Sequence, residues 1–103
     1  MSSILDFLQQ KQFSEPQKQA AWAKAQIVVG HDPSAIRKDV CGAWIKWVDY
    51  GNTASQYGWE VDHIYPESRG GTDHPDNLQA LHWQNNRAKG DSISGFTCAV
   101  KAM

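Results

Sequence analysis

The sequence lacks long apolar runs and any strong excess of charge. No stretch of 18 apolar residues occurs, which excludes an ordinary transmembrane helix. Ten basic residues nearly balance eleven acidic ones, so binding of nucleic acid by bulk positive charge is excluded. Contact with nucleic acid must therefore come from a local basic face or from a bound cation. The first residues also lack the basic start and apolar core of a signal peptide, which favours a cytoplasmic protein.

Cysteine is scarce, and repeats and low-complexity tracts are absent. Cys41 and Cys98 lie 57 positions apart, and one disulfide between them is conceivable. Nothing else indicates secretion, so we expect two reduced, inert and buried thiols in a cytoplasm. The 103 residues fit a single domain. We expect residues 1–13 to form an N-terminal extension and residues 14–103 to form the folded unit.

Aromatic residues, in contrast, are abundant. Five Trp, three Tyr and three Phe are expected to supply much of the core, because each buries roughly 150–250 Å². A tryptophan is more often a core residue than a platform for stacking bases. We therefore expect core positions for Trp22, Trp44 and Trp59.

Local patterns predict an α+β chain. Ser14 with Gln17 three residues later predicts a capping box, and the helix is expected to run to about Val29 because Gly30 follows. A short second helix is expected up to Ile36. Strands are predicted at 43–50, 59–64 and 78–81, and a last helix at 82–89. The interval 66–76 is predicted to be an irregular loop, and the tail 92–103 is left open as a strand or a loose segment.

Four polar residues near the C-terminal half have the types and spacing of a hydrolytic site. Asp62 and His63 lie next to each other at the end of a predicted strand, where successive side chains point to opposite sides. Asn77 follows fourteen residues after His63, and Asn86 nine residues later. A hairpin closed by a long loop would bring Asp62, Asn77 and Asn86 together as oxygen ligands, which suit a hard cation. Histidine titrates near neutral pH and can activate a water molecule.

Short signatures around these residues resemble the HNH endonuclease family. The segments with the resemblance are RKDVCGAWI at 37–45, DYGN at 49–52, YGWEVDHIYP at 57–66, GGTDHPDNLQALH at 70–82 and QNNRAKGD at 84–91. Their order and spacing match over roughly two-thirds of the chain. The resemblance implies a ββα-metal (His-Me finger) core near the C-terminus, with its motif at 57–91, preceded by N-terminal helices.

The resemblance also implies a role for each of the four residues. Asp62 and Asn86 would be the metal ligands, His63 the general base for the attacking water, and Asn77 the residue that pins the loop so that the His63 ring is oriented. The implied cofactor is one divalent cation, Mg²⁺ or Mn²⁺, with Zn²⁺ or Ni²⁺ as alternatives. The implied reaction is hydrolysis of DNA to 5′-phosphate and 3′-hydroxyl ends.

The sequence departs from many family members where they hold a structural zinc with two CxxC pairs. The first pair is reduced to Cys41 with Trp44 in the second position, and the second pair reads His82 and Asn85. We therefore expect no structural zinc, and we hypothesise that packing of Trp44 and Trp83 replaces it. His82 lies four residues before Asn86, so ligation of the catalytic cation by His82 remains an alternative.

Basic residues flank the expected site, and the sequence leaves some questions open. Arg69, Arg87 and Lys89 are candidates for phosphate contacts, although exposed basic residues are common without any such role. The expected partner is DNA, without a membrane, and a homodimer that cuts both strands stays as open as a monomer that nicks one. Rival interpretations are a DNA-binding or assembly module without turnover, a toxin-like or RNA-directed nuclease, and a purely structural protein.

Overall fold

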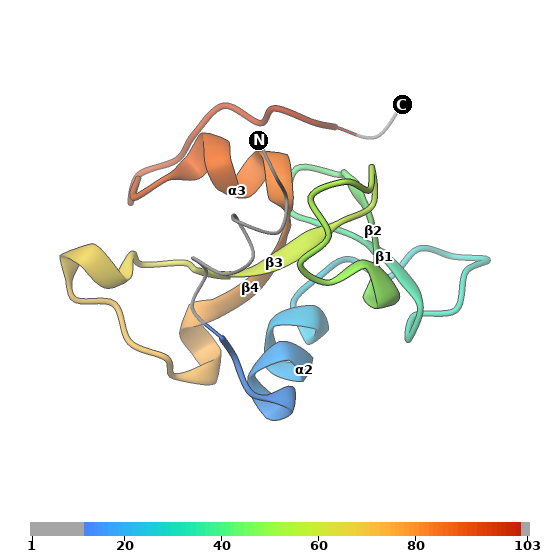
Figure 1. Cartoon of the computed structure of the whole chain (residues 1–103), viewed down its shortest axis with the longest axis horizontal. Helices are drawn as coiled ribbons and strands as arrows, with labels where there is room; N and C mark the ends of the chain where they lie inside the picture. The colour runs from blue at the N-terminus through green and yellow to red at the C-terminus, as the bar shows by residue number, and fades with distance from the viewer. Residues whose placement is uncertain (1–11, 102–103) are drawn as a thin grey trace.

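The computed structural model describes residues 12–101, so most of the expected N-terminal extension lies outside the described residues (Figure 1). The elements follow one another as α2 (Glu15–Ala23), β1 (Ile36–Lys38), β2 (Trp44–Lys46), β3 (Trp59–His63), β4 (Leu78–His82) and α3 (Trp83–Lys89). Three short 3-10 turns cover η1 (Trp47–Asp49), η2 (Glu67–Arg69) and η3 (Pro75–Asn77). The α+β prediction is confirmed.

Helix α2 starts as predicted but ends early. The Ser14 Oγ accepts from the Gln17 amide at 3.2 Å, and the Gln17 Oε1 accepts from the Ser14 amide at 2.8 Å, which completes the capping box. The prediction that the helix reaches Val29 is wrong. The chain leaves the helix after Ala23, and the backbone of Gln26 pairs with that of Lys38 instead. A tertiary strand contact thus ends this helix, well before the glycine that the sequence suggested.

The predicted second helix is also wrong. Residues 32–35 form a turn in which the Asp32 carboxylate accepts from the Ser34 amide and hydroxyl, and β1 begins directly afterwards at Ile36. One helix, α2, therefore precedes the strands within residues 12–101. Asp32 stabilises this turn, and the turn leads into a strand and not into a helix.

Two antiparallel hairpins make up the sheet structure. In the first, β1 pairs with β2, so that Lys38 lies opposite Trp44 and Ile36 opposite Lys46. The strand expected at 43–50 stops at Lys46 and continues as the turn η1. In the second hairpin β3 pairs with β4 in a register that sets Glu60 opposite Leu81 and Asp62 opposite Gln79. These two strands and α3 lie within a residue or two of their predicted positions.

Alternation along β3 separates its apolar and polar side chains. Trp59 and Val61 join the apolar cluster that also contains Trp22 of α2. Glu60 and Asp62 are buried as well, but they bond to side chains of α3. Both faces of the β3–β4 hairpin are therefore covered. In Figure 1 α2 and α3 lie on either side of this hairpin.

The core contains two of the three tryptophans that were expected there. Trp22 and Trp59 are buried, and their rings lie 5.1 Å apart. Trp44 is only half buried and its ring contacts His31 and the ammonium of Lys38 at the surface, so its prediction as a core residue is wrong. The reason is the register of β2, in which Ile45 points to the core and its neighbour Trp44 points outward.

A buried carboxylate, Asp39, connects the first hairpin to α3. Its two oxygens accept from the amides of Cys41, Ala43 and His82 and from the side-chain amide of Asn85, at 2.9–3.0 Å. Asn85 in turn bonds to the backbone of Ala99 and Val100, which fixes the C-terminal segment over α3. We call Asp39, Asn85 and their partners the Asp39 hub.

The two cysteines form a disulfide next to this hub. Cys41 is bonded to Cys98, so the expectation of two reduced thiols is wrong. The expected cytoplasmic location, from which the reduced state was inferred, loses support as well, because disulfides persist in oxidising compartments. Cys41, His82 and Asn85, three of the four positions compared above with the CxxC pairs, take part in this disulfide and in the hub. The packing of Trp44 and Trp83 in place of a zinc stays a hypothesis.

None of the helices in the described part of the chain is long and apolar enough to cross a membrane.

Candidate active site

The loop between β3 and β4 is held in shape by Asn77. The Oδ1 of Asn77 accepts from the amide of Tyr65 at 2.8 Å, and its Nδ2 donates to the carbonyls of Tyr65 and Thr72 at 3.1 and 2.8 Å. Gly71 is needed in this loop, because a Cβ at that position would collide with the carbonyl of Tyr65. Asn77 thus ties both arms of the loop together through these three hydrogen bonds.

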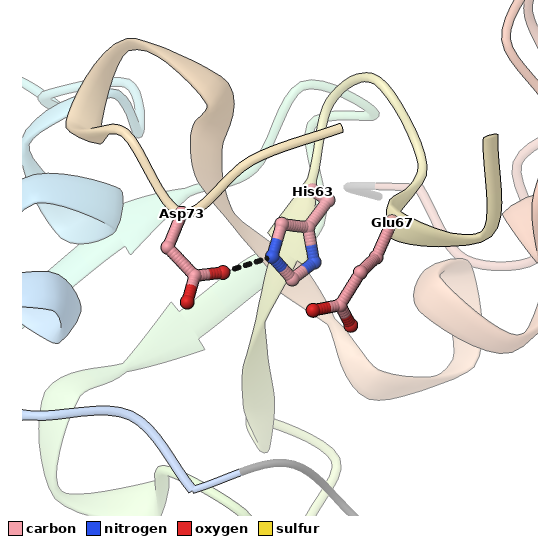
Figure 2. Close-up of side chains that lie close together, drawn as sticks. All are labelled: His63, Glu67 and Asp73. Atoms are coloured by element: carbon pink, nitrogen blue, oxygen red, sulfur yellow. Dashed lines mark hydrogen bonds and ion pairs between the residues drawn. The ribbon is translucent and has the colours of Figure 1, made fainter. Parts of the chain in front are cut away.

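His63 lies at the end of β3 between two acidic side chains that the loop supplies. Its Nε2 is 2.7 Å from Oδ1 of Asp73, and Figure 2 shows the carboxylate of Glu67 on the other side of the ring. One ring nitrogen and one oxygen of each carboxylate lie within 4.8 Å of one another. The ring of Phe13 packs at 5.6 Å from the imidazole. These contacts fix the plane and direction of the imidazole.

Asp62, on the same strand, is buried in an ion pair. Its Oδ1 lies 3.2 Å from the ammonium of Lys89, and its Oδ2 accepts from Gln79 at 2.9 Å. Asp62 and Lys89 are each only 6% exposed. Burial raises the pKa of Asp62 above its usual value, whereas the hydrogen bond from Gln79 and the charge of Lys89 act in the opposite direction. The ion pair therefore provides part of the positive charge that a buried carboxylate needs.

Asn86 comes from the middle of α3 and faces β3. Its Nδ2 donates to Oε1 of the buried Glu60 at 2.8 Å, which fixes the orientation of the amide. Its Oδ1 has no hydrogen-bond partner among residues 12–101 and can serve as a ligand. Arg87 also binds Glu60, through two hydrogen bonds of 2.6 and 3.1 Å.

A hollow of about 200 Å³ brings these groups together, and we call it the catalytic hollow. Its lining includes Asp62, His63, Glu67, Asn86 and Asp91. Asn77 does not line this hollow, and its role is to hold the loop between β3 and β4 in shape. Carboxylate and amide oxygens dominate the lining, and this donor set suits a hard divalent cation such as Mg²⁺ or Mn²⁺. The residues present therefore fit the cation that the sequence implied.

The three basic residues that were expected to contact phosphates have different surroundings. Arg69 is exposed, and its Nε donates to the carbonyl of Asp91 at 3.2 Å. Arg87 is engaged with Glu60. Lys89 is buried, and its ammonium bonds to Asp62 and to the carbonyl of His63 at 2.9 Å. The position of Lys89 speaks against a direct phosphate contact and gives it a structural role beside the catalytic hollow.

His82, the alternative ligand, is also engaged elsewhere. Its Nε2 lies 2.8 Å from the carbonyl of Gln56, and its Nδ1 accepts from the amide of Gln84 at the start of α3. Both ring nitrogens are therefore used in capping and in fixing a loop. This geometry leaves no ring nitrogen of His82 available for the cation.

Sequence reasoning missed Asp73 and Glu67 as neighbours of His63. Both lie in the loop that was predicted to be irregular, and the path of such a loop cannot be read from local pattern. The one signal available was that two acidic residues occur within ten positions of a candidate base. Lys24 was missed for the same reason, although its ammonium binds the carbonyls of Pro75 and Leu78 and ties α2 to the end of the loop.

Comparison with known families gives one match. A family model described as HNH endonuclease matches residues 40–92, which is just over half of the chain. The matched span contains β2, β3, β4, α3 and all four residues of the sequence motif. No curated protein and no solved structure matched the chain.

Proposed function

Because the chain belongs to the HNH endonuclease family, we propose that it is a metal-dependent DNA endonuclease that hydrolyses phosphodiester bonds to 5′-phosphate and 3′-hydroxyl ends. The observation that carries the proposal is the catalytic hollow, where Asp62, His63 and Asn86 converge from a strand end and a helix. A surface aspartate–histidine pair without function would have no reason to share a hollow with a helix residue that the same motif predicts.

The proposed core consists of β3, the loop 64–77, β4 and α3, which we assign as the ββα-metal unit. Support comes from the antiparallel pairing of the strands and from the contact of α3 with both. Side chains on β3 and α3 then face each other across a fixed distance. Such a rigid frame suits catalysis, because a base and a cation ligand must keep their geometry while the substrate changes.

His63 is the proposed general base. Its Nε2 faces the carboxylate of Asp73, which favours the tautomer with the proton on that nitrogen. The lone pair of Nδ1 is then left to take a proton from a water molecule. The resulting hydroxide attacks phosphorus in line with the 3′ oxygen. The bond from phosphorus to this oxygen breaks, and the oxygen takes up a proton from water and leaves as the 3′-hydroxyl of the broken strand. Asn77 supports this arrangement through the loop, since it holds the carbonyl of Thr72 next to Asp73.

Asp62 and Asn86 are the proposed protein ligands of one divalent cation. When bound, the cation neutralises charge that builds up on the phosphoryl and leaving oxygens. The Oδ1 of Asn86 is already oriented by the bond between its Nδ2 and Glu60. The ammonium of Lys89 lies 3.2 Å from Oδ1 of Asp62 and supplies a neighbouring positive charge on that side of the carboxylate.

A supercoiled-plasmid assay tests the proposal. Wild type and His63→Ala are each incubated with Mg²⁺, with Mn²⁺ and with EDTA, and circular dichroism checks that both proteins are folded. Wild type is expected to nick or cut the plasmid only when a cation is present. His63→Ala is expected to lose turnover by roughly three to four orders of magnitude, because the base and its positioning act together.

Two outcomes of this assay count against the proposal. Cutting by His63→Ala at the wild-type rate would remove His63 from the reaction. Absence of cutting by folded wild type with either cation would favour a DNA-binding module without turnover. A parallel incubation with an RNA of matched sequence separates a DNA endonuclease from an RNA-directed one.

A further inference from the structure

The basic residues of the chain differ in whether their charged groups have hydrogen-bond or ion-pair partners. Among residues 12–101, six lysines and arginines bond to carboxylates or backbone carbonyls: Lys18, Lys24, Arg37, Arg69, Arg87 and Lys89. The remaining three of that range, Lys38, Lys46 and Lys101, have no hydrogen bond or ion pair there. A protein with a net charge near −1 thus keeps a small set of cations without counter-charges.

Two of these lysines, Lys38 and Lys46, lie against aromatic rings. The ammonium of Lys38 lies 4.5 Å from the centre of the Trp44 ring, and that of Lys46 lies 4.4 Å from the Tyr57 ring. The strand register explains the arrangement. Lys38 pairs with Trp44, and Lys46 is two residues further along β2. The side chains of Lys38, Trp44 and Lys46 therefore share the outer face of the hairpin.

The same face is hollowed. One hollow of about 210 Å³ is lined by His31, Ile36, Trp44, Lys46 and Tyr57. A second hollow of about 400 Å³ shares Trp44 and Tyr57 and reaches Lys101. We call the two together the aromatic groove. Neither lining contains an aspartate or glutamate, in contrast to the acidic lining of the catalytic hollow.

We propose that the aromatic groove binds an unpaired segment of the DNA strand, with bases against Trp44 and Tyr57 and phosphates on Lys38, Lys46 and Lys101. This inference rests on the proposed function for the identity of the strand. Aromatic platforms beside unpaired lysines are the features that single-stranded nucleic acid uses, since every base has a face to stack and every phosphate a charge to neutralise. A duplex buries its base faces and offers nothing to the rings.

The groove and the catalytic hollow lie at opposite ends of one strand. Figure 1 shows β1 and β2 near the start of β3, and the amide of Lys46 in β2 donates to the carbonyl of Tyr57 just before β3. His63 ends β3 at the loop. A five-residue strand spans roughly 13 Å, or about four nucleotides at a stacked spacing of ~3.4 Å. One DNA strand of a few nucleotides can therefore reach from the groove to the hollow. The substrate class that this predicts is DNA with a single-stranded stretch beside the cut.

Binding is tested in EDTA, so that no cleavage takes place. Fluorescence anisotropy measures the affinity of wild type for a duplex with a ten-nucleotide single-stranded tail and for a blunt duplex, over a series of salt concentrations. The variants are Trp44→Leu and the double variant Lys38→Gln/Lys46→Gln. The control is Lys18→Gln, which removes one charge outside the groove.

We expect wild type to bind the tailed DNA more tightly than the blunt duplex. Trp44→Leu should weaken binding of the tailed DNA by about tenfold or more. The double lysine variant should weaken it as well and reduce the salt slope by roughly 1.4, or 0.7 for each lost phosphate contact on a single strand. Lys18→Gln should change the affinity less than about twofold.

The proposal is overturned if both groove variants bind the tailed DNA as wild type does, if they weaken the blunt duplex equally, or if wild type does not prefer the tail. The lysine variant carries the test if Trp44→Leu fails to fold. A plasmid assay with Mg²⁺ separates the two proposals. If tail binding depends on the groove residues but wild type does not cut the plasmid, the nuclease proposal fails and the groove proposal stands. If wild type cuts the plasmid but the groove variants bind the tail as wild type does, the groove proposal fails and the nuclease proposal stands.

Discussion

Asn85 and Asn86 are neighbours on α3 with the same side chain, and they face two different regions of the molecule. Asn85 is fully buried in the Asp39 hub, where both its amide nitrogen and its oxygen are used in four hydrogen bonds. Asn86 lines the catalytic hollow, makes one hydrogen bond through its nitrogen, and leaves its oxygen available. A rotation of about 100° between adjacent helix positions is enough to separate a structural amide from a proposed ligand.

This difference distinguishes a polar side chain whose hydrogen-bonding atoms are all used from one that keeps an unused acceptor. A buried amide with all its partners stabilises the fold, and its loss leaves other buried groups unpaired. An oriented amide with one unused oxygen beside carboxylates offers a binding position. Stability measurements should therefore respond to the Asp39 hub, and turnover should respond to the catalytic hollow.

Of the changes that test this comparison, Asn86→Ala should have the largest effect, and it should act on turnover. Loss of a proposed cation ligand should lower the plasmid-cutting rate by roughly 1,000-fold, or ~4 kcal/mol of transition-state stabilisation. The free energy of unfolding should change little, because a single partly exposed hydrogen bond is lost. Calorimetric titration with Mn²⁺ should show weaker cation binding in parallel. An unchanged cutting rate would show that Asn86 is not a ligand.

The matching change on the other side is Asn85→Ala. Four hydrogen bonds are lost, one of them to the buried Asp39 carboxylate, so the free energy of unfolding should fall by about 3 kcal/mol. Denaturation by urea measures this value. The cutting rate per folded molecule should stay within about twofold of wild type. If Asn85→Ala lowered the cutting rate as far as Asn86→Ala does and left the free energy of unfolding unchanged, the proposed separation of a structural region from a catalytic one would be wrong.

Removal of the disulfide is the next smaller effect. Cys41→Ser/Cys98→Ser should lower the free energy of unfolding by about 2–4 kcal/mol, since the bond closes a long loop of chain next to the hub. The same loss is expected when wild type is reduced with dithiothreitol. The double variant should be insensitive to the reductant, and a melting temperature equal to that of oxidised wild type would show that the bond adds nothing to the hub.

The smallest effect should come from Asp73, which contacts His63 without lining the hollow. Asp73→Ala should lower the cutting rate by about tenfold at saturating DNA, with the KM for DNA unchanged, because the ring orientation is no longer fixed. Asp73→Asn keeps an oxygen that can accept from Nε2 and should recover most of the rate. Nitrogen NMR of the imidazole reports the tautomer directly. Equal rates in all three proteins would remove Asp73 from the positioning of His63.

Local pattern predicted the part of the fold that carries the proposed site. The alternation of side chains around Val61 and Asp62 is a local signal, and β3, β4 and α3 could be located from such local patterns. The motif named three residues that line the catalytic hollow, Asp62, His63 and Asn86. It gave no indication of Glu67 and Asp91, which line the hollow as well. The end of α2 could not be predicted, because it depends on the pairing of Gln26 with Lys38, a contact that forms only after the chain folds.

The Asp39 hub also could not be predicted from local sequence patterns. Asp39 looks like an ordinary surface residue in the sequence, and its burial depends on four donors from segments up to 46 positions away. The pairing of Cys41 with Cys98 depends on the same long-range folding. Reasoning from composition therefore assigned both cysteines to a reduced state that the three-dimensional contacts contradict.

The bond between Cys41 and Cys98 turns the middle of the chain into a covalent ring. Every residue of the proposed catalytic set, from Asp62 to Asn86, lies inside this ring, whereas α2 lies outside it. A protease that cuts once in the exposed stretch around Gly70 would therefore release no fragment, and the cut chain would run as one species on a gel until it is reduced. In the oxidised state, a single scission of the backbone cannot detach the strand that carries His63 from the helix that carries Asn86.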